Sequence, residues 1–340
     1  MTAEANRNLR AAAPGASRIR SLTLRDRFVA LGGVASIALF FAAVCILFAL
    51  VTQSFLTSNN ILNVLRQSAP LLIVAGTMTL VITTGGIDLS VGSVVALISA
   101  LSAFLLQADL PWPLVVVAML ACGGAIGATQ GFFIAYEGVP AFIVTLAGLS
   151  VIRGFALLLT GGYSIPVDPG SGFGDIGRAW IFGLPLPALI AVVMLAVVYV
   201  VFNATRFGRY VTGMGSNAEA VRRAGVDIRR TGLAVYMISS ASAALAGVIL
   251  TSRLGSGSSN AGLGFELDVI AAVVLGGTSL FGGRGTVMGT VLGALTVAVI
   301  ANGLILSHMS PFLSPIVTGF IILGAIWLNF RLFRRASKTR

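Results

Sequence analysis

Long apolar runs fill most of the chain, separated by short polar or glycine-rich stretches. A helix needs about 20 mainly apolar residues to cross a bilayer, so a window of that length locates candidate spans. We therefore expect an all-α integral membrane protein with about ten transmembrane helices in one domain, residues 28–330. The predicted spans lie near residues 28–52, 61–83, 91–107, 112–136, 139–160, 180–203, 231–252, 267–280, 286–307 and 312–330.

Two glycine-rich stretches break this pattern, "TTGGIDLSVGS" at 83–93 and "GGTSLFGGRGT" at 276–286. Non-helical backbone at membrane depth occurs where protein or water surrounds it, so both stretches indicate a polar interior and hence transport. We expect Asp88 or Ser90 to cap the helix after the first break. The run 267–280 rises only about 21 Å and should not cross a core of about 30 Å alone. The candidate residues for the helix breaks and a translocation path are Gly85, Gly86, Asp88, Ser90, Glu266, Asp268, Gly276, Gly277 and Thr278.

A weak internal repeat links the two halves of the chain. "GIDLSVGSVVAL" at 86–97 lines up with "GFELDVIAAVVL" at 264–275, five predicted spans later. An odd number of spans inverts the second unit, so the match predicts a five-plus-five inverted repeat with broken helices. A chance match remains an alternative, because glycine and leucine are abundant. One helix further on, each half has a glycine at every fourth position, which favours close helix packing over a direct substrate role. These glycines are Gly123, Gly127, Gly131, Gly285, Gly289 and Gly293.

Composition and charge support a membrane protein and orient it. The chain is 57% hydrophobic, with a net charge of +11 and 22 lysines and arginines. Most of these basic residues lie in an arginine-rich tail (1–27), in 204–230, at Arg284 and in a basic tail (331–340). Ten spans place all four on one face, and basic residues stay on the cytoplasmic side, so we expect both termini to be cytoplasmic. Topology explains the charge, and a nucleic-acid partner is unnecessary.

The longest predicted cytoplasmic loop, residues 204–230, contains a candidate docking element. Ser216 and Glu219 have the S-x-x-E spacing of a capping box, and Gly225 can supply a left-handed stop. We predict a helix of about two turns between them, which is too short to be stable alone in water. It needs a surface, either anionic membrane lipid held by Arg222 and Arg223 or a cytoplasmic partner protein.

A family resemblance favours the partner protein. Glu219, Ala220 and Gly225 keep the spacing of the coupling loop of bacterial ATP-binding-cassette (ABC) importer permeases, although Val221 replaces the second alanine of that motif. With "GGIDLSVGS", "GRYVTGMGSNAEAVRRAGV" and "LGFELDVIAAVVLGGTSLFGGRGTVMGTVLGA", the chain resembles the ribose-type sugar permeases from about residue 40 to 330. The N-terminal tail lies outside the resemblance.

The resemblance implies a bacterial inner-membrane permease that works as a homodimer or a paralogous heterodimer. It also implies an ABC ATPase subunit with two nucleotide-binding domains and a periplasmic or lipid-anchored sugar-binding protein. The ATPase would dock on residues 216–225, through Ser216, Asn217, Glu219, Ala220, Arg222 and Gly225.

Other functions fit the sequence less well. The single lysine, Lys338, lies in the basic tail, so the chain has no P-loop, and ATP and Mg²⁺ would be bound by the ATPase partner. One histidine, His308, and two cysteines in apolar runs indicate no metal site, no cofactor and no enzyme. An ion-coupled secondary transporter of a small neutral solute is the alternative, but such coupling commonly uses carboxylates within spans. The one charge clearly at membrane depth is Arg153, which could snorkel or pair with an acid.

Overall fold

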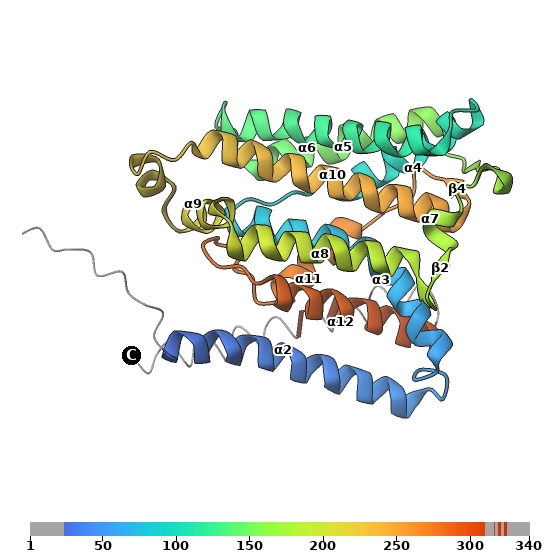
Figure 1. The fold of residues 1–340 in the computed structure, drawn as a ribbon, viewed down its shortest axis with the longest axis horizontal. Helices are drawn as coiled ribbons and strands as arrows, with labels where there is room; N and C mark the ends of the chain where they lie inside the picture. Colours follow the sequence, from blue (N-terminus) through green and yellow to red (C-terminus); the bar gives the residue numbers. More distant parts are fainter. Residues whose placement is uncertain (1–23, 310–315, 317–318, 321–322, 325–340) are drawn as a thin grey trace, which may run out of the picture.

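The computed structural model describes residues 24–309, 316, 319, 320, 323 and 324. These residues form a bundle of roughly parallel and antiparallel helices with two short strand pairs at one end (Figure 1). The α-helices are α2 (Leu24–Val51), α3 (Ser58–Thr83), α4 (Val91–Gln107), α5 (Trp112–Ala135), α6 (Ala141–Thr160), α7 (Asp175–Arg178), α8 (Leu186–Ala204), α9 (Arg206–Arg223), α10 (Ile228–Leu254), α11 (Phe265–Leu275) and α12 (Val287–Leu306). The remaining elements are β1 (Ile165–Pro166), η1 (Pro169–Ser171), β2 (Trp180–Ile181), β3 (Leu184–Pro185) and β4 (Ser256–Gly257).

Within the described residues, seven helices are long and apolar enough to cross a membrane. The chain is thus an all-α, multi-pass membrane protein, but ten spans are not confirmed. Helix α4 has 17 residues and α11 has 11. The tenth expected span, 312–330, lies largely outside the described residues.

The span expected at 180–203 begins later, at Leu186. Before it, β2 and β3 form a hairpin whose turn, Phe182 and Gly183, has positive φ at both residues (51° and 77°). Such a turn matches the twist of paired strands, and prolines just before and inside the first turn of α8 fix where the helix starts.

Helices α3 and α10 form the centre of the bundle. In α3, 83% of the residues in its apolar stretch are buried, compared with 17% in α6, which lies at the periphery. The two central helices run antiparallel, because Arg253 at the end of α10 donates to the carbonyl of Gln67 near the start of α3. The peripheral helices leave apolar side chains exposed, as lipid-facing helices do.

The two halves share an order of elements. Each has a long central helix, a non-helical stretch, a shorter helix, and a longer helix: α3, α4 and α5 in one half, α10, α11 and α12 in the other. Because α3 and α10 are antiparallel, the second unit is inverted. The helix starts do not match the sequence alignment of the two halves, however. The alignment pairs Phe265, where α11 begins, with Ile87, but α4 begins four residues later, at Val91.

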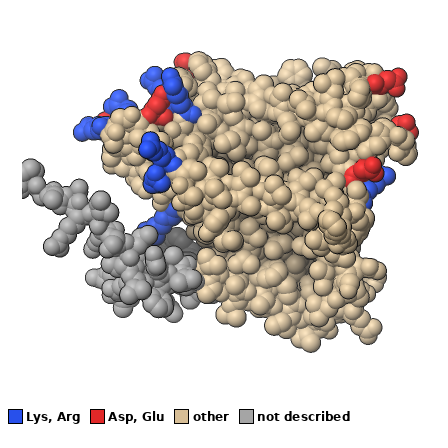
Figure 2. Space-filling model, viewed as in Figure 1, with Lys and Arg blue, Asp and Glu red and all other residues tan. Residues whose placement is uncertain are grey.

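The two ends of the bundle differ in charge. Arg side chains gather at the end where α9 lies, and the flanks of the bundle show almost no charge (Figure 2). The exposed arginines at the α9 end are Arg206, Arg209, Arg222, Arg223, Arg229, Arg230 and Arg284. The strand pairs lie at the opposite end, which we call the hairpin end (Figure 1).

Candidate functional site

The first helix break follows α3. Gly85 has φ 87°, which ends the helix, and residues 86–90 have no regular secondary structure before α4 begins. Asp88 lies in this stretch, fully buried. Its Oδ1 accepts from the backbone N–H of Ser90 at 3.0 Å and from the Ser90 hydroxyl at 2.7 Å. Its Oδ2 accepts from the hydroxyl of Ser239, in α10, at 2.8 Å.

The expected cap of α4 is wrong in its details. Ser90 is the N-cap residue, but its backbone is already helical (φ −81°, ψ −13°) and its side chain makes no capping bond. Asp88 binds the N–H of the cap residue itself rather than an N–H inside the helix. The reason is that Ser90 takes the N-cap position, so Asp88 lies two residues before the cap.

Two further helices, α5 and α6, hold the first break in place. The Gln130 amide of α5 donates to the Ser90 hydroxyl at 2.9 Å, and the Thr145 hydroxyl of α6 donates to the carbonyl of Ile87 at 3.1 Å. A side chain at Gly86 would collide with the hydroxyl of Tyr236 in α10. Non-helical backbone at membrane depth requires such partners, and all of these are uncharged.

Another non-helical stretch, which the sequence pattern did not indicate, lies between α10 and α11 at residues 255–264, and we call it the second break. Arg153, in the middle of α6, donates to the carbonyls of Ser259 at 2.6 Å and Ala261 at 2.9 Å, and to that of Gly262 at 3.3 Å. The arginine therefore neither snorkels nor forms an ion pair among the described residues. It is the donor for the carbonyls of Ser259 and Ala261, whereas the carbonyl of Gly262 also accepts from the N–H of Phe265 at 3.2 Å.

Glu266 lies beside this break, in the first turn of α11. Its Oε2 is buried against Gly92 at the start of α4, without a hydrogen-bond partner in the described structure. The starts of α4 and α11 therefore meet, and the carboxylate lies at the positive end of the α4 dipole. Asp268, which shares the first turn of α11, is exposed and is not part of this contact.

The loop from α11 to α12, residues 276–286, lies at the α9 end. Gly277 has φ 85°, and the buried Thr278 accepts from the N–H of Thr286 at 3.3 Å. A side chain at Gly276 would overlap the backbone of α12. The Gly283 N–H donates to the carbonyl of Thr83 at 2.9 Å. This loop is therefore bonded directly to the end of α3, where the first break begins.

The periodic glycines lie at close approaches between helices. Side chains at Gly123, Gly127 and Gly131 would collide with α10, which crosses α5 there. Side chains at Gly289 and Gly293 would collide with α11. Gly285 lies before α12 and approaches Thr83 instead. In this structure the glycines contact neighbouring helices rather than a cavity.

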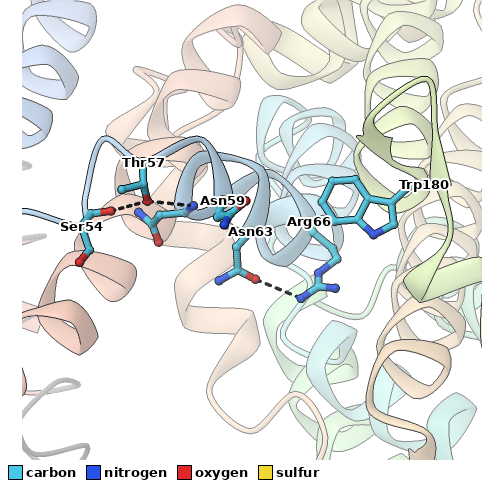
Figure 3. A pocket seen from close by; sticks show the side chains of 7 residues that line it. Ser54, Thr57, Asn59, Asn63, Arg66 and Trp180 are labelled. Carbon is cyan, nitrogen blue, oxygen red and sulfur yellow. Dashed lines mark hydrogen bonds between the residues drawn. The ribbon is translucent and has the colours of Figure 1, made fainter.

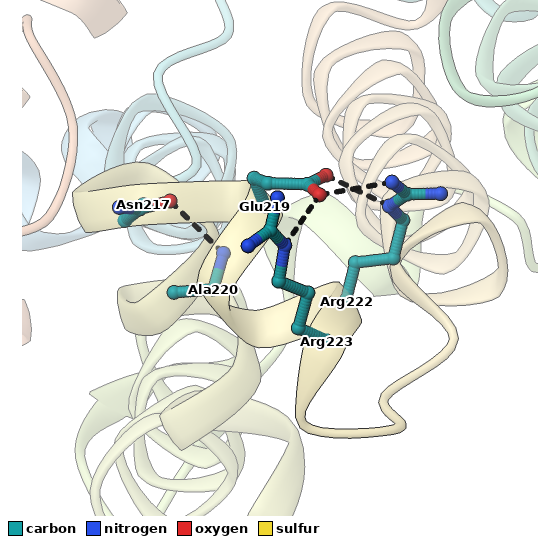
Figure 4. Close-up of polar contacts among 5 residues, drawn as sticks. All are labelled: Asn217, Glu219, Ala220, Arg222 and Arg223. Atoms are coloured by element: carbon teal, nitrogen blue, oxygen red, sulfur yellow. Dashed lines mark hydrogen bonds and ion pairs between the residues drawn. The ribbon is translucent and has the colours of Figure 1, made fainter.

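The coupling segment, residues 216–225, differs from its prediction. Helix α9 already begins at Arg206 and kinks at Asn217 (φ −164°, ψ 92°). Asn217 caps the second part, since its Oδ1 accepts from the N–H of Ala220 at 2.9 Å (Figure 4). Ser216 is still inside the first part, where its hydroxyl donates to the carbonyl of Thr212. The predicted capping box is therefore wrong by one residue.

Glu219 does not reach back to the cap as a capping box requires. It accepts from Arg222 at 2.8 Å and from Arg223 at 2.9 Å, on an exposed surface (Figure 4). The hydrogen bond from Arg222, then that from Arg223, lowers the pKa of Glu219 to about 2, so the carboxylate stays charged at neutral pH. Gly225, the last residue of the segment, has φ 83° and lies just beyond the end of α9, where it stops the helix.

Sequence reasoning missed a pocket at the hairpin end. It has a volume of about 450 Å³ and lies between the start of α3 and the β2–β3 hairpin (Figure 3). Arg66 donates to Asn63 at 3.1 Å, while its buried Nε has no partner in the described structure. The sequence feature that could have indicated the pocket is the cluster of asparagines just before Arg66 in "SNNILNVLRQ". The lining residues are Ser54, Thr57, Asn59, Asn60, Asn63, Arg66 and Trp180.

An apolar helix bundle whose centre is interrupted by two hydrogen-bonded breaks is the architecture of a membrane transport protein. Residues 60–326 match the family described as the permease component of the branched-chain amino acid transport system, and the chain belongs to this permease family. It is a transport subunit and not an enzyme. Among the described residues, no three His, Cys, Asp or Glu side chains gather as metal ligands would.

Individual relatives cover nearly the whole chain. The chain is 38% identical to the probable ABC transporter permease protein YphD of Escherichia coli K12 over 88% of this chain and 90% of that protein. It is 40% identical to the ribose import permease protein RbsC of Haemophilus influenzae, over 84% and 90%. It is 34% identical to the xylose transport system permease protein XylH of Escherichia coli K12, over 95% and 96%. No solved structure matches the chain.

Proposed function

We propose that this permease is the membrane subunit of an ABC importer for a monosaccharide or a related polyol. The observation that carries the proposal is the similarity to ribose and xylose permeases across 84% and 95% of the chain. The chemistry of the breaks agrees. The Asp88 carboxylate and Arg153 are both bound within the breaks by hydroxyls, backbone groups or carbonyls. The other side chains there are hydroxyls and one amide, which suit a neutral hydroxylated solute better than an ion.

In this proposal the permease works as a homodimer or with a paralogous permease. A sugar-binding protein delivers the solute at the hairpin end, where the pocket around Arg66 opens. An ABC ATPase subunit with two nucleotide-binding domains docks at the α9 end on residues 216–225 and binds the ATP and Mg²⁺. The basic α9 end is cytoplasmic, because basic residues stay on that side.

Uptake of labelled ribose and xylose tests the proposal. Cells that express the permease with its cognate ATPase and binding protein should accumulate at least one of them, and depletion of ATP should stop accumulation. An ionophore that collapses proton and sodium gradients while ATP is maintained should leave uptake intact. Uptake that follows the ion gradient instead would favour the secondary transporter.

A further inference from the structure

Phe281 is a large apolar side chain at the basic end of the bundle, and in the described part of the chain it is almost fully exposed. It lies in the loop between α11 and α12 and is 90% exposed, and the neighbouring Leu280 is 42% exposed. Arg284, in the same loop, is also exposed. An exposed aromatic residue next to a cation, at the charged end of a membrane protein, is typical of a protein contact site.

The loop holds Phe281 outward by its own hydrogen bonds. The Ser279 N–H donates to the carbonyl of Arg284, and the Gly282 N–H donates to that of Ser279, both at 3.0 Å. Gly282 and Gly283 have φ 80° and 73°, which closes the loop tightly. The exposure of Phe281 is therefore a feature of an ordered loop.

The loop is continuous with the coupling segment. A Cβ on Gly283 would lie 2.6 Å from the hydroxyl oxygen of Ser216, the first residue of that segment. A Cβ on Gly215 would overlap the amide nitrogen of Gly283. A protein that covers residues 216–225 thus meets the loop 280–284 next to them.

The coupling segment alone lacks an apolar anchor. Its sequence, "SNAEAVRRAG", has no aromatic residue, and its exposed positions are small or polar. Interfaces draw most of their binding energy from a few buried aromatic residues and arginines. We propose that Phe281, flanked by Leu280 and Arg284, is a second docking contact for the ABC ATPase subunit. This rests on the proposed function, and the matching site on the ATPase is an apolar pocket with an acidic rim.

The structure offers a matched control for testing the anchor. Phe182 is 100% exposed in the β2–β3 hairpin, at the opposite end of the bundle. The affinity of the purified permease for its cognate ATPase subunit is measured in nanodiscs. Phe281→Ser should weaken it by about tenfold or more, the usual effect of losing an aromatic anchor. Phe281→Leu should restore most of it, and Phe182→Ser should bind like the wild type.

Crosslinking identifies the occupant. A photo-reactive benzoylphenylalanine at position 281 should link to the ATPase subunit in the assembled complex. A link only to lipid or to a second copy of this chain, or wild-type affinity in Phe281→Ser, would overturn the second contact while leaving the importer assignment in place. A wild-type permease that binds no ABC ATPase would instead reject the proposed function, and the second contact with it.

Discussion

The carboxylate of Asp88 and the hydroxyl of Ser239 are joined by a hydrogen bond of 2.8 Å, although 151 positions separate them in the sequence. This bond ties the break after α3 to the middle of α10, so the two central helices share one buried polar contact. Both side chains are fully buried. The break is thereby held against α10, and both oxygens of the Asp88 carboxylate already accept hydrogen bonds.

Substitutions at Asp88 test whether its carboxylate serves as a structural hydrogen-bond acceptor or as a charge that couples transport to an ion. Asp88→Asn keeps one acceptor oxygen for Ser90, and its amide can donate to Ser239, so most transport should remain. Asp88→Leu removes every partner. Hydrogen bonds between membrane helices contribute about 0.6 kcal/mol on average and up to about 1.7, so assembly or activity should fall clearly. Sugar uptake and the yield of assembled protein are the measurements, with the exposed Asp109→Asn as the control. An assembled but inactive Asp88→Asn protein would show that the charge itself is required.

Removal of the Arg153 side chain should destabilise the second break. Arg153→Met leaves the carbonyls of Ser259 and Ala261 without donors, and unsatisfied buried polar groups cost about 1–3 kcal/mol each. The thermal unfolding temperature of the Arg153→Met protein should fall strongly, and its sugar uptake should be lost. Arg153→Lys should be intermediate, because an ammonium lacks the planar fork of a guanidinium. Arg206→Met removes an exposed arginine at the α9 end and should leave the unfolding temperature unchanged. Equal stability of Arg153→Met and Arg206→Met would argue against the anchoring role.

Two glycines of α5 test whether the periodic glycines pack helices. An added Cβ at Gly127 would overlap the backbone of Tyr236 and Met237, whereas at Gly124 it meets nothing within 4 Å. Alanine favours a helix over glycine by up to about 1 kcal/mol. Gly124→Ala should therefore keep or raise the unfolding temperature of the purified protein, while Gly127→Ala should lower it. Similar temperatures for the two variants would contradict close packing at Gly127.

The sequence anticipated the parts of the fold that follow from local pattern. The span predicted at 91–107 coincides with α4, because glycines precede its apolar run and the polar "QAD" and a proline follow it. It could not predict that Arg153 binds Ser259 or that Asp88 binds Ser239, because in a uniformly apolar chain no pattern shows which distant helices meet. Helix α9 was missed for a related reason. Its glycines argue against a helix, but Gly208 and Gly215 permit close backbone contacts that override propensity.

The orientation of the bundle can be read from cysteine labelling. In a background with Cys45→Ala and Cys122→Ala, Ser164→Cys places a thiol in the exposed loop after α6, and Ala218→Cys places one in the coupling segment. An impermeant maleimide should label Ser164→Cys in intact cells and Ala218→Cys only after lysis, since basic residues stay in the cytoplasm. Labelling of both from outside, or the reverse pattern, would refute a cytoplasmic α9 end.

Gly215 is where movement of the coupling segment would reach the first break. A Cβ there would overlap the carbonyl of Thr83 and the amide nitrogen of Gly283, which are hydrogen-bonded to each other at 2.9 Å. Gly215→Ala should push these two groups apart and separate α9 from the end of α3, although alanine itself favours the helix. We expect the variant to assemble with the ATPase and to hydrolyse ATP, while sugar uptake falls at least about tenfold, a barrier change of about 1.4 kcal/mol. Ala218→Ser, exposed three residues later, should transport normally. Normal uptake in Gly215→Ala would mean that this contact does not transmit movement, and loss of ATPase binding would place the defect in docking instead.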